Sequence, residues 1–83
     1  MSVDPKWSVL QQALYYDQQG DWHQAHDLVD GMEGKKAAHI HAYLHRKEGD
    51  AWNARYWYNR ADQPVFEGSL EEEWEKLWNR YST

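Results

Sequence analysis

The stretch that decides the fold runs from His39 to Asp62 and reads HIHAYLHRKEGDAWNARYWYNRAD. Near its centre lies the pair Gly49-Asp50. Glycine adopts the left-handed backbone conformation that ends many helices, and aspartate is a favoured cap for the helix that follows. The pair therefore predicts a sharp turn between two helices, one from about Lys35 to Lys47 or Glu48 and one that Asp50 caps and Pro64 limits.

The same pattern occurs once more, 29 residues earlier in the chain. The equivalent positions are Gly20-Asp21 and Gly49-Asp50, Ala13 and Ala42, and Ala25 and Ala54. Small residues at fixed offsets allow antiparallel helices to approach closely, and periods of about 20–50 residues are typical of stacked helical hairpins. The sequence therefore predicts two hairpins of the same design.

The repeat resembles the tetratricopeptide pattern, in which helix pairs carry small residues at these places and an aromatic residue in the second helix. Tyr58 and Ala61 match the later positions of that second helix. The offset of 29 residues is shorter than the roughly 34 residues of a standard repeat, which indicates shorter hairpins or a different stacking. The segment 41–61 also resembles a group of small, mostly bacterial proteins that share an HAxLHRxEGDxxNAxYWYxRA-like sequence and have no assigned activity.

The remaining helices are predicted from their caps. Asp4-Pro5 favours the start of a first helix that runs to about Gln19, because aspartate caps and proline fits the first turn. Ser69 followed by Glu72 is typical of a capping box. The helix after it has a one-sided apolar stripe, Leu70, Trp74, Leu77, Trp78 and Tyr81. We therefore predict one all-α domain over residues 1–83, with two tetratricopeptide-like helical hairpins and a closing C-terminal helix.

Composition excludes several classes of function. The 83 residues contain no cysteine, so disulfides and thiolate sites are excluded. The net charge of −5 argues against a nucleic-acid binder. No apolar run approaches the ~18 residues of a membrane span, and the N-terminus lacks the pattern of a signal peptide. We expect a cytoplasmic protein that binds neither nucleic acid nor membrane.

Two histidines are the most conspicuous candidate site. His41 and His45 share a helix face, and Glu48 follows one turn later, so the three could ligate a divalent metal ion. A pair spaced H-x-x-x-H is common by chance, and we expect hydrogen-bonded structural histidines with no metal and no cofactor. His45 with Glu48 or Asp50 would also suit acid–base chemistry. No serine or cysteine nucleophile accompanies them, and we expect no catalytic residues.

Four further residues near the turn are candidates for binding. Asn53 and Arg60 lie on one side of their helix, from which they could pair with Glu48 or Asp50 and lock the hairpin. An anion site built from Arg46, Arg60 and the amides of the turn is the alternative. Trp57 is expected to be either a core anchor or the wall of a shallow pocket.

Arg46 also belongs to a second stripe, which includes Lys36, His39 and Tyr43. In tetratricopeptide-like stacks these positions face the concave groove, where they could bind an acidic or C-terminal peptide. The favoured interpretation is a solvated helix face, with Trp7, Leu10 and Leu14 covered by the last helix.

The predicted function is non-catalytic binding of a protein or peptide, with a second copy of the chain as one candidate partner. Trp52 and Tyr56 are expected to point away from the core and to form such an interface, unless the 63–68 loop covers them with Phe66. The alternative function is a small-ligand or metal-binding protein, or an enzyme of undetected type, that uses His41, His45 and Glu48 with Arg46 and Arg60. The predicted binding residues are His41, His45, Arg46, Asn53, Trp57 and Arg60.

Overall fold

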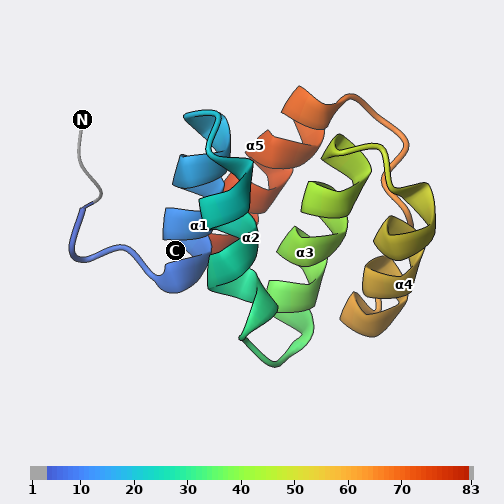
Figure 1. Cartoon of the computed structure of the whole chain (residues 1–83), viewed down its shortest axis with the longest axis horizontal. Coiled ribbons are helices and arrows are strands. Elements are labelled where there is room, and N and C mark those ends of the chain that lie inside the picture. Colours follow the sequence, from blue (N-terminus) through green and yellow to red (C-terminus); the bar gives the residue numbers. More distant parts are fainter. Residues whose placement is uncertain (1–3, 83) are drawn as a thin grey trace.

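The computed structural model describes residues 4–82, which form five helices and no strand (Figure 1). The helices are α1 (Val9–Gln18), α2 (Trp22–Asp30), α3 (Lys35–Lys47), α4 (Ala51–Ala61) and α5 (Leu70–Tyr81). The prediction of an all-α fold is confirmed.

The two hairpin turns have the same geometry. Gly20 has a φ of +87° and Gly49 a φ of +88°, a left-handed conformation that glycine adopts without strain. Asp21 and Asp50 then cap α2 and α4, each accepting a bond from the backbone nitrogen of the third residue of the helix. The two Gly-Asp pairs of the sequence therefore adopt the same backbone conformation.

The start of α1 differs from the prediction. Ser8, not Asp4, is the N-cap, and its side chain and that of Gln11 bond reciprocally to each other's backbone nitrogen. Asp4 instead accepts a bond from the backbone nitrogen of Trp7 and forms a separate turn. The capping box satisfies two free amides at once, which explains why the helix begins there. The capping box predicted at Ser69 is confirmed.

The C-terminal helix closes the stack, as predicted. Figure 1 shows the two hairpins side by side with α5 crossing behind them, and α5 packs on α1 and α3. Its Leu77 is buried with residues of α1, α2 and α3 in the main core cluster. That cluster consists of Ala13, Leu14, Ala25, Val29, Ala37, Ile40, Tyr43, Leu44 and Leu77.

The concave groove predicted on α3 is occupied by α5. Tyr43 is only 2% exposed, a ring nitrogen of His39 lies 2.8 Å from the hydroxyl of Tyr81, and Arg46 reaches Glu73. The hypothesis of an acidic peptide in this groove is therefore wrong for the folded chain, because its own last helix takes the place of the peptide.

A second, smaller core cluster joins the helices of the second hairpin. Ala42 and Ala54 are buried against Tyr58, and Trp57 and Phe66 pack on this group. Phe66 thus folds back from the loop onto the core, which leaves Trp52 and Tyr56 uncovered. The alternative in which the loop shields these two residues is wrong.

Candidate functional site

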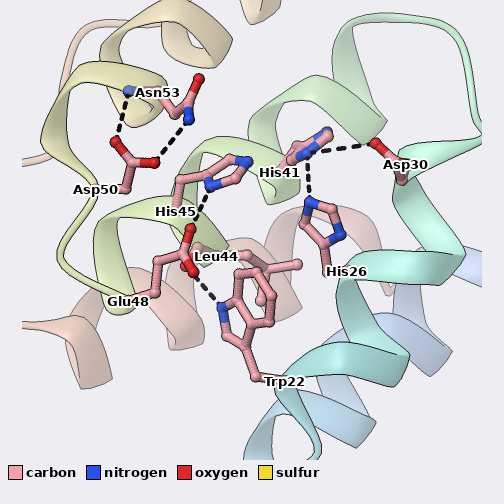
Figure 2. Close-up of polar contacts among 9 residues, drawn as sticks. All are labelled: Trp22, His26, Asp30, His41, Leu44, His45, Glu48, Asp50 and Asn53. Atoms are coloured by element: carbon pink, nitrogen blue, oxygen red, sulfur yellow. Dashed lines mark hydrogen bonds and ion pairs between the residues drawn. The ribbon is translucent and has the colours of Figure 1, made fainter.

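Three imidazoles meet between the two hairpins. His26 comes from α2, and His41 and His45 come from successive turns of α3, which packs directly on α2 (Figure 2). The Nε2 atoms of His26 and His41 lie 2.9 Å apart. One ring nitrogen from each of the three residues lies within 4.8 Å of the other two. His41 is 2% exposed, so the cluster reaches into the interior.

Two tryptophans enclose the three imidazoles. Trp57 stacks on His41 with ring centres 3.9 Å apart, and His41 in turn stacks on His45 at 4.9 Å. Trp22 stacks on His26 at 4.8 Å and donates a 2.8 Å hydrogen bond from its Nε1 to the carbonyl of Leu44. These contacts fix the planes of the imidazoles and anchor α2 to α3.

Two carboxylates border the cluster. Nδ1 of His45 lies 2.7 Å from Oε1 of Glu48, and Nε2 of His41 lies 3.9 Å from Oδ1 of Asp30. Because Glu48 engages Nδ1 of His45, the other ring nitrogen of His45 is directed toward His41, as Figure 2 shows. The side chain of Asp30 is 61% exposed, so this edge of the cluster opens to water.

The electrostatic environment keeps His41 neutral at pH 7. Burial is the largest effect, and the neighbouring His26 and His45 act in the same direction, so the pKa of His41 falls from 6.5 to about 4. Asp30 opposes the shift but does not cancel it. A neutral imidazole retains a lone pair on one ring nitrogen, the form that binds metals.

Only part of the predicted set of binding residues comes together. His41, His45 and Trp57 form one stack, whereas Nδ2 of Asn53 donates a 2.6 Å hydrogen bond to Asp50 at the turn. The contact expected between Asn53 and the turn is thus present, and it does not involve an imidazole.

The pairing expected for Arg60 is wrong. Its guanidinium lies over the rings of Tyr56 and Trp57 and donates to the Tyr56 hydroxyl at 3.3 Å. It forms no ion pair with Glu48 or Asp50 within residues 4–82. Stacking on two adjacent rings of its own helix holds this side chain along α4, away from the turn.

Arg46 points toward α5. Its guanidinium pairs with Oε1 of Glu73 at 2.9 Å and also bonds the carbonyl of Gly68, while the hydroxyl of Tyr58 donates to Glu73. Glu73 is 1% exposed, and this burial raises its pKa despite the contacts with Arg46 and Tyr58. Because Arg46 and Arg60 contact different elements, the predicted anion site that combines them is not formed.

A second buried carboxylate has the same kind of partners. Asp17, 1% exposed, accepts a 2.6 Å hydrogen bond from the hydroxyl of Tyr43 and a 2.9 Å contact from Nζ of Lys47. Burial raises the pKa of Tyr43, so its hydroxyl stays protonated and remains a donor. Asp17 therefore links α1 to α3 through a hydroxyl and a cation, whereas Glu73 links α5 to α3 through Arg46 and to α4 through Tyr58.

Sequence reasoning missed His26, Asp17 and Glu73. Asp17 and Glu73 both continue apolar stripes at helical spacing, Asp17 after Leu14 and Glu73 after Leu70. A carboxylate on such a stripe is a signal for a buried, paired acid. His26 follows Trp22 by one turn, which is a weaker signal for a place at the hairpin interface.

Comparisons with protein-family models, curated proteins and solved structures found no match. The resemblances to the tetratricopeptide repeat and to the bacterial segment stay predictions. Within residues 4–82, no helix combines the length and apolar character needed to cross a bilayer.

The outer face of α4 exposes two large aromatic side chains. Trp52 is 70% exposed and Tyr56 is 45% exposed, as the sequence predicted. With Arg55 and Asn59 they line a shallow depression. Among the described helices, only α3 has its backbone packed on α4, and it covers the opposite side. We refer to Trp52, Arg55, Tyr56, Asn59 and Arg60 as the α4 surface.

Proposed function

We propose that this protein is a non-catalytic binding module that docks an acidic, partly apolar segment of another protein on the α4 surface. The observation that carries the proposal is the exposure of Trp52 and Tyr56, one helical turn apart on the outer face of α4. Residues four apart on a helix form one continuous ridge, which suits contact with a single segment.

The composition of the α4 surface supports a protein partner. Tryptophan, tyrosine and arginine are the residue types that contribute most to binding at protein interfaces. Arg60 already lies over the Tyr56 ring, so its side chain is partly ordered before any partner binds. A pre-ordered surface loses less conformational entropy on association.

The charge of the α4 surface favours an acidic occupant. α4 carries Arg55 and Arg60 and no carboxylate, while the whole chain has a net charge of −5. Neither arginine forms an ion pair with another residue in the range 4–82. Arginine binds carboxylates through bidentate hydrogen bonds, so acidic side chains of a partner could pair with Arg55 and Arg60. A second copy of the chain would bring together two net-negative molecules, so an acidic segment of a different protein is favoured.

Selection from a random peptide library tests this proposal. The wild-type protein is used to enrich displayed peptides, and the Trp52→Glu/Tyr56→Glu variant is used to remove those that bind elsewhere. We expect enriched peptides rich in Asp and Glu with interspersed aromatic or aliphatic residues. Their binding should weaken with added salt, because the arginine contacts are solvent-exposed.

Val65→Glu is the matched control, because Val65 is an exposed apolar residue, 46% exposed, outside the α4 surface. It should bind the selected peptides like the wild type. Peptides without acidic bias, or equal enrichment by the wild type and the double variant, would contradict the proposal. If sedimentation shows a dimer that the double variant loses, the occupant is a second copy and the acidic-partner proposal is overturned.

A further inference from the structure

We propose that His26, His41 and His45 form a binding site for a divalent transition-metal ion such as Zn²⁺. The site is independent of the α4 surface, and it joins the two hairpins through ligands from α2 and α3. The sequence offered only the pair His41 and His45, for which no metal was expected. The third imidazole, brought in by α2, changes the chemistry.

The distances are close to those of a bound ion. Three nitrogen ligands around zinc, each about 2.0–2.1 Å from the metal, lie roughly 3.3 Å from one another in a tetrahedral site. The two Nε2 atoms of His26 and His41 are 2.9 Å apart, and all three residues offer a nitrogen within a 4.8 Å span. Rotation of the imidazoles about their side-chain bonds, with loss of the stacking of His41 on His45, would bring the three lone pairs onto one ion.

Glu48 acts as the supporting carboxylate that metal-binding histidines commonly have. It lies 2.7 Å from Nδ1 of His45, so that this nitrogen carries the proton and Nε2 keeps its lone pair. A carboxylate behind a ligating imidazole fixes the tautomer and raises the basicity of the ligand. Figure 2 shows this Nε2 on the side of the ring that faces His41.

Asp30 lies where its carboxylate could be the fourth ligand or could hold a water molecule that is. Its carboxylate oxygen is 3.9 Å from Nε2 of His41, at the exposed edge of the cluster. Three histidines with one carboxylate or water form a donor set that suits Zn²⁺ and other borderline divalent ions. Asp30 also gives the entrance a negative charge, which attracts a cation.

In the metal-free protein one Nε2 of the His26–His41 pair donates a hydrogen bond to the other. When a metal binds, the proton of this hydrogen bond moves to Nδ1 of the donor ring, and both Nε2 lone pairs become ligands. The low pKa of His41 supports this reading, because a neutral ring is ready to bind at pH 7.

The test is a titration of the tag-free, chelator-stripped protein with Zn²⁺ by calorimetry and with Co²⁺ by visible absorption. We expect one ion per chain and the intense bands of tetrahedral Co²⁺. The variants His26→Ala and His45→Ala should lose affinity by more than the roughly 10-fold expected for Glu48→Gln, which removes only the supporting carboxylate.

The control variant is His23→Ala, because His23 lies on the same helix as His26 and is exposed outside the cluster. It should bind like the wild type. Imidazole NMR signals of the wild-type protein give a readout that needs no variant: zinc should shift His26, His41 and His45 and leave His23 in place. No binding by the wild type, unchanged binding by His26→Ala, or an equal loss in His23→Ala would overturn the proposal.

Discussion

α3 makes buried polar contacts on two sides, one toward α2 and α4 and the other toward α1 and α5. The two sides satisfy these buried polar groups in different ways. Toward α1 and α5, the carboxylates of Asp17 and Glu73 each bind a tyrosine hydroxyl and a cationic side chain. Toward α2 and α4, imidazoles face other imidazoles and stack with tryptophans. Opposite charges close the first network. The second brings like groups together.

The difference determines how each side should respond to a change. A buried charge whose partner is removed is left uncompensated, which costs several kcal/mol. A buried neutral imidazole that loses a partner costs less, roughly 1–3 kcal/mol for the unsatisfied donor or acceptor. We therefore expect the carboxylate side to tolerate the loss of a partner less well than the imidazole side.

The largest effect is expected for Arg46→Met. The change leaves the carboxylate of Glu73, which is 1% exposed, without its cation. We expect the free energy of unfolding to fall by about 4 kcal/mol, as for other buried pairs with one partner removed. Urea unfolding followed by circular dichroism measures it.

Two further variants identify the cause of that loss. Arg80→Met removes an exposed arginine and should cost less than about 0.5 kcal/mol. Adding Glu73→Gln to Arg46→Met should restore part of the stability, because a neutral amide no longer requires a cation and still accepts from Tyr58. If the double variant is no more stable than Arg46→Met alone, the unpaired charge is not the cause.

The next effect is a loss of stability in mild acid that arises on the imidazole side. The pKa of His41 is 6.5 in the unfolded chain and about 4 in the folded protein, so the unfolded state takes up the proton first. The contribution of His41 to the free energy of unfolding is fully present above pH 6.5, and it is lost as the pH falls toward 4. At ~1.4 kcal/mol per pKa unit, His41 contributes a loss on the order of 3 kcal/mol, and the lowered pKa of His39 acts in the same direction.

Unfolding of the chelator-treated protein at pH 7, 5.5 and 4 measures this loss. His41→Gln is the comparison, because it removes the titrating ring and should make the dependence on pH shallower. Equal stability at pH 7 and 5, or a His41 NMR signal that titrates near pH 6.5, would show that the cluster is not shielded as described.

Much of the fold follows from local sequence signals, and the site does not. Gly49-Asp50 sets its turn through a φ that favours glycine and a cap a few residues away, and both are readable in the chain. The His26–His41 contact joins residues 15 apart and the Tyr43–Asp17 contact residues 26 apart. Such contacts depend on the rotation of one helix against another, which hydrophobic periodicity specifies only to within about a residue position.

The competition between caps shows the same limit at shorter range. Asp4-Pro5 has the residues of a helix start, and the stronger Ser8–Gln11 capping box lies only four residues later. Either pattern can start a helix. The Ser8–Gln11 pair caps α1 because it satisfies more free backbone amides than Asp4 would.

A smaller effect is expected for Tyr43→Phe on the carboxylate side. The change removes the 2.6 Å hydrogen bond to Asp17 and leaves Lys47 as the remaining partner. Hydrogen bonds to charged groups contribute roughly 1.5–3 kcal/mol, so we expect a loss of about 2 kcal/mol in urea unfolding. Tyr56→Phe, at a tyrosine that is 45% exposed, should change stability by less than about 0.5 kcal/mol. Equal effects of the two substitutions would mean that the Tyr43 bond does not stabilise the fold.

The smallest effect is expected for His26→Phe in the metal-free protein, and it tests the comparison most directly. Phenylalanine can keep the stacking on Trp22, so the main loss is the contact between the Nε2 atoms of His26 and His41. His41 stays neutral, and Asp30, 3.9 Å away at the exposed edge, can accept a hydrogen bond from its Nε2 after a small shift. We expect a cost of about 1 kcal/mol, the value of one ordinary hydrogen bond, in the same urea experiment. A cost near that of Arg46→Met would mean that the imidazole pair is as tightly required as the buried ion pairs. The two sides of α3 would then not differ in kind, and the imidazole side would have no freedom to bind an ion.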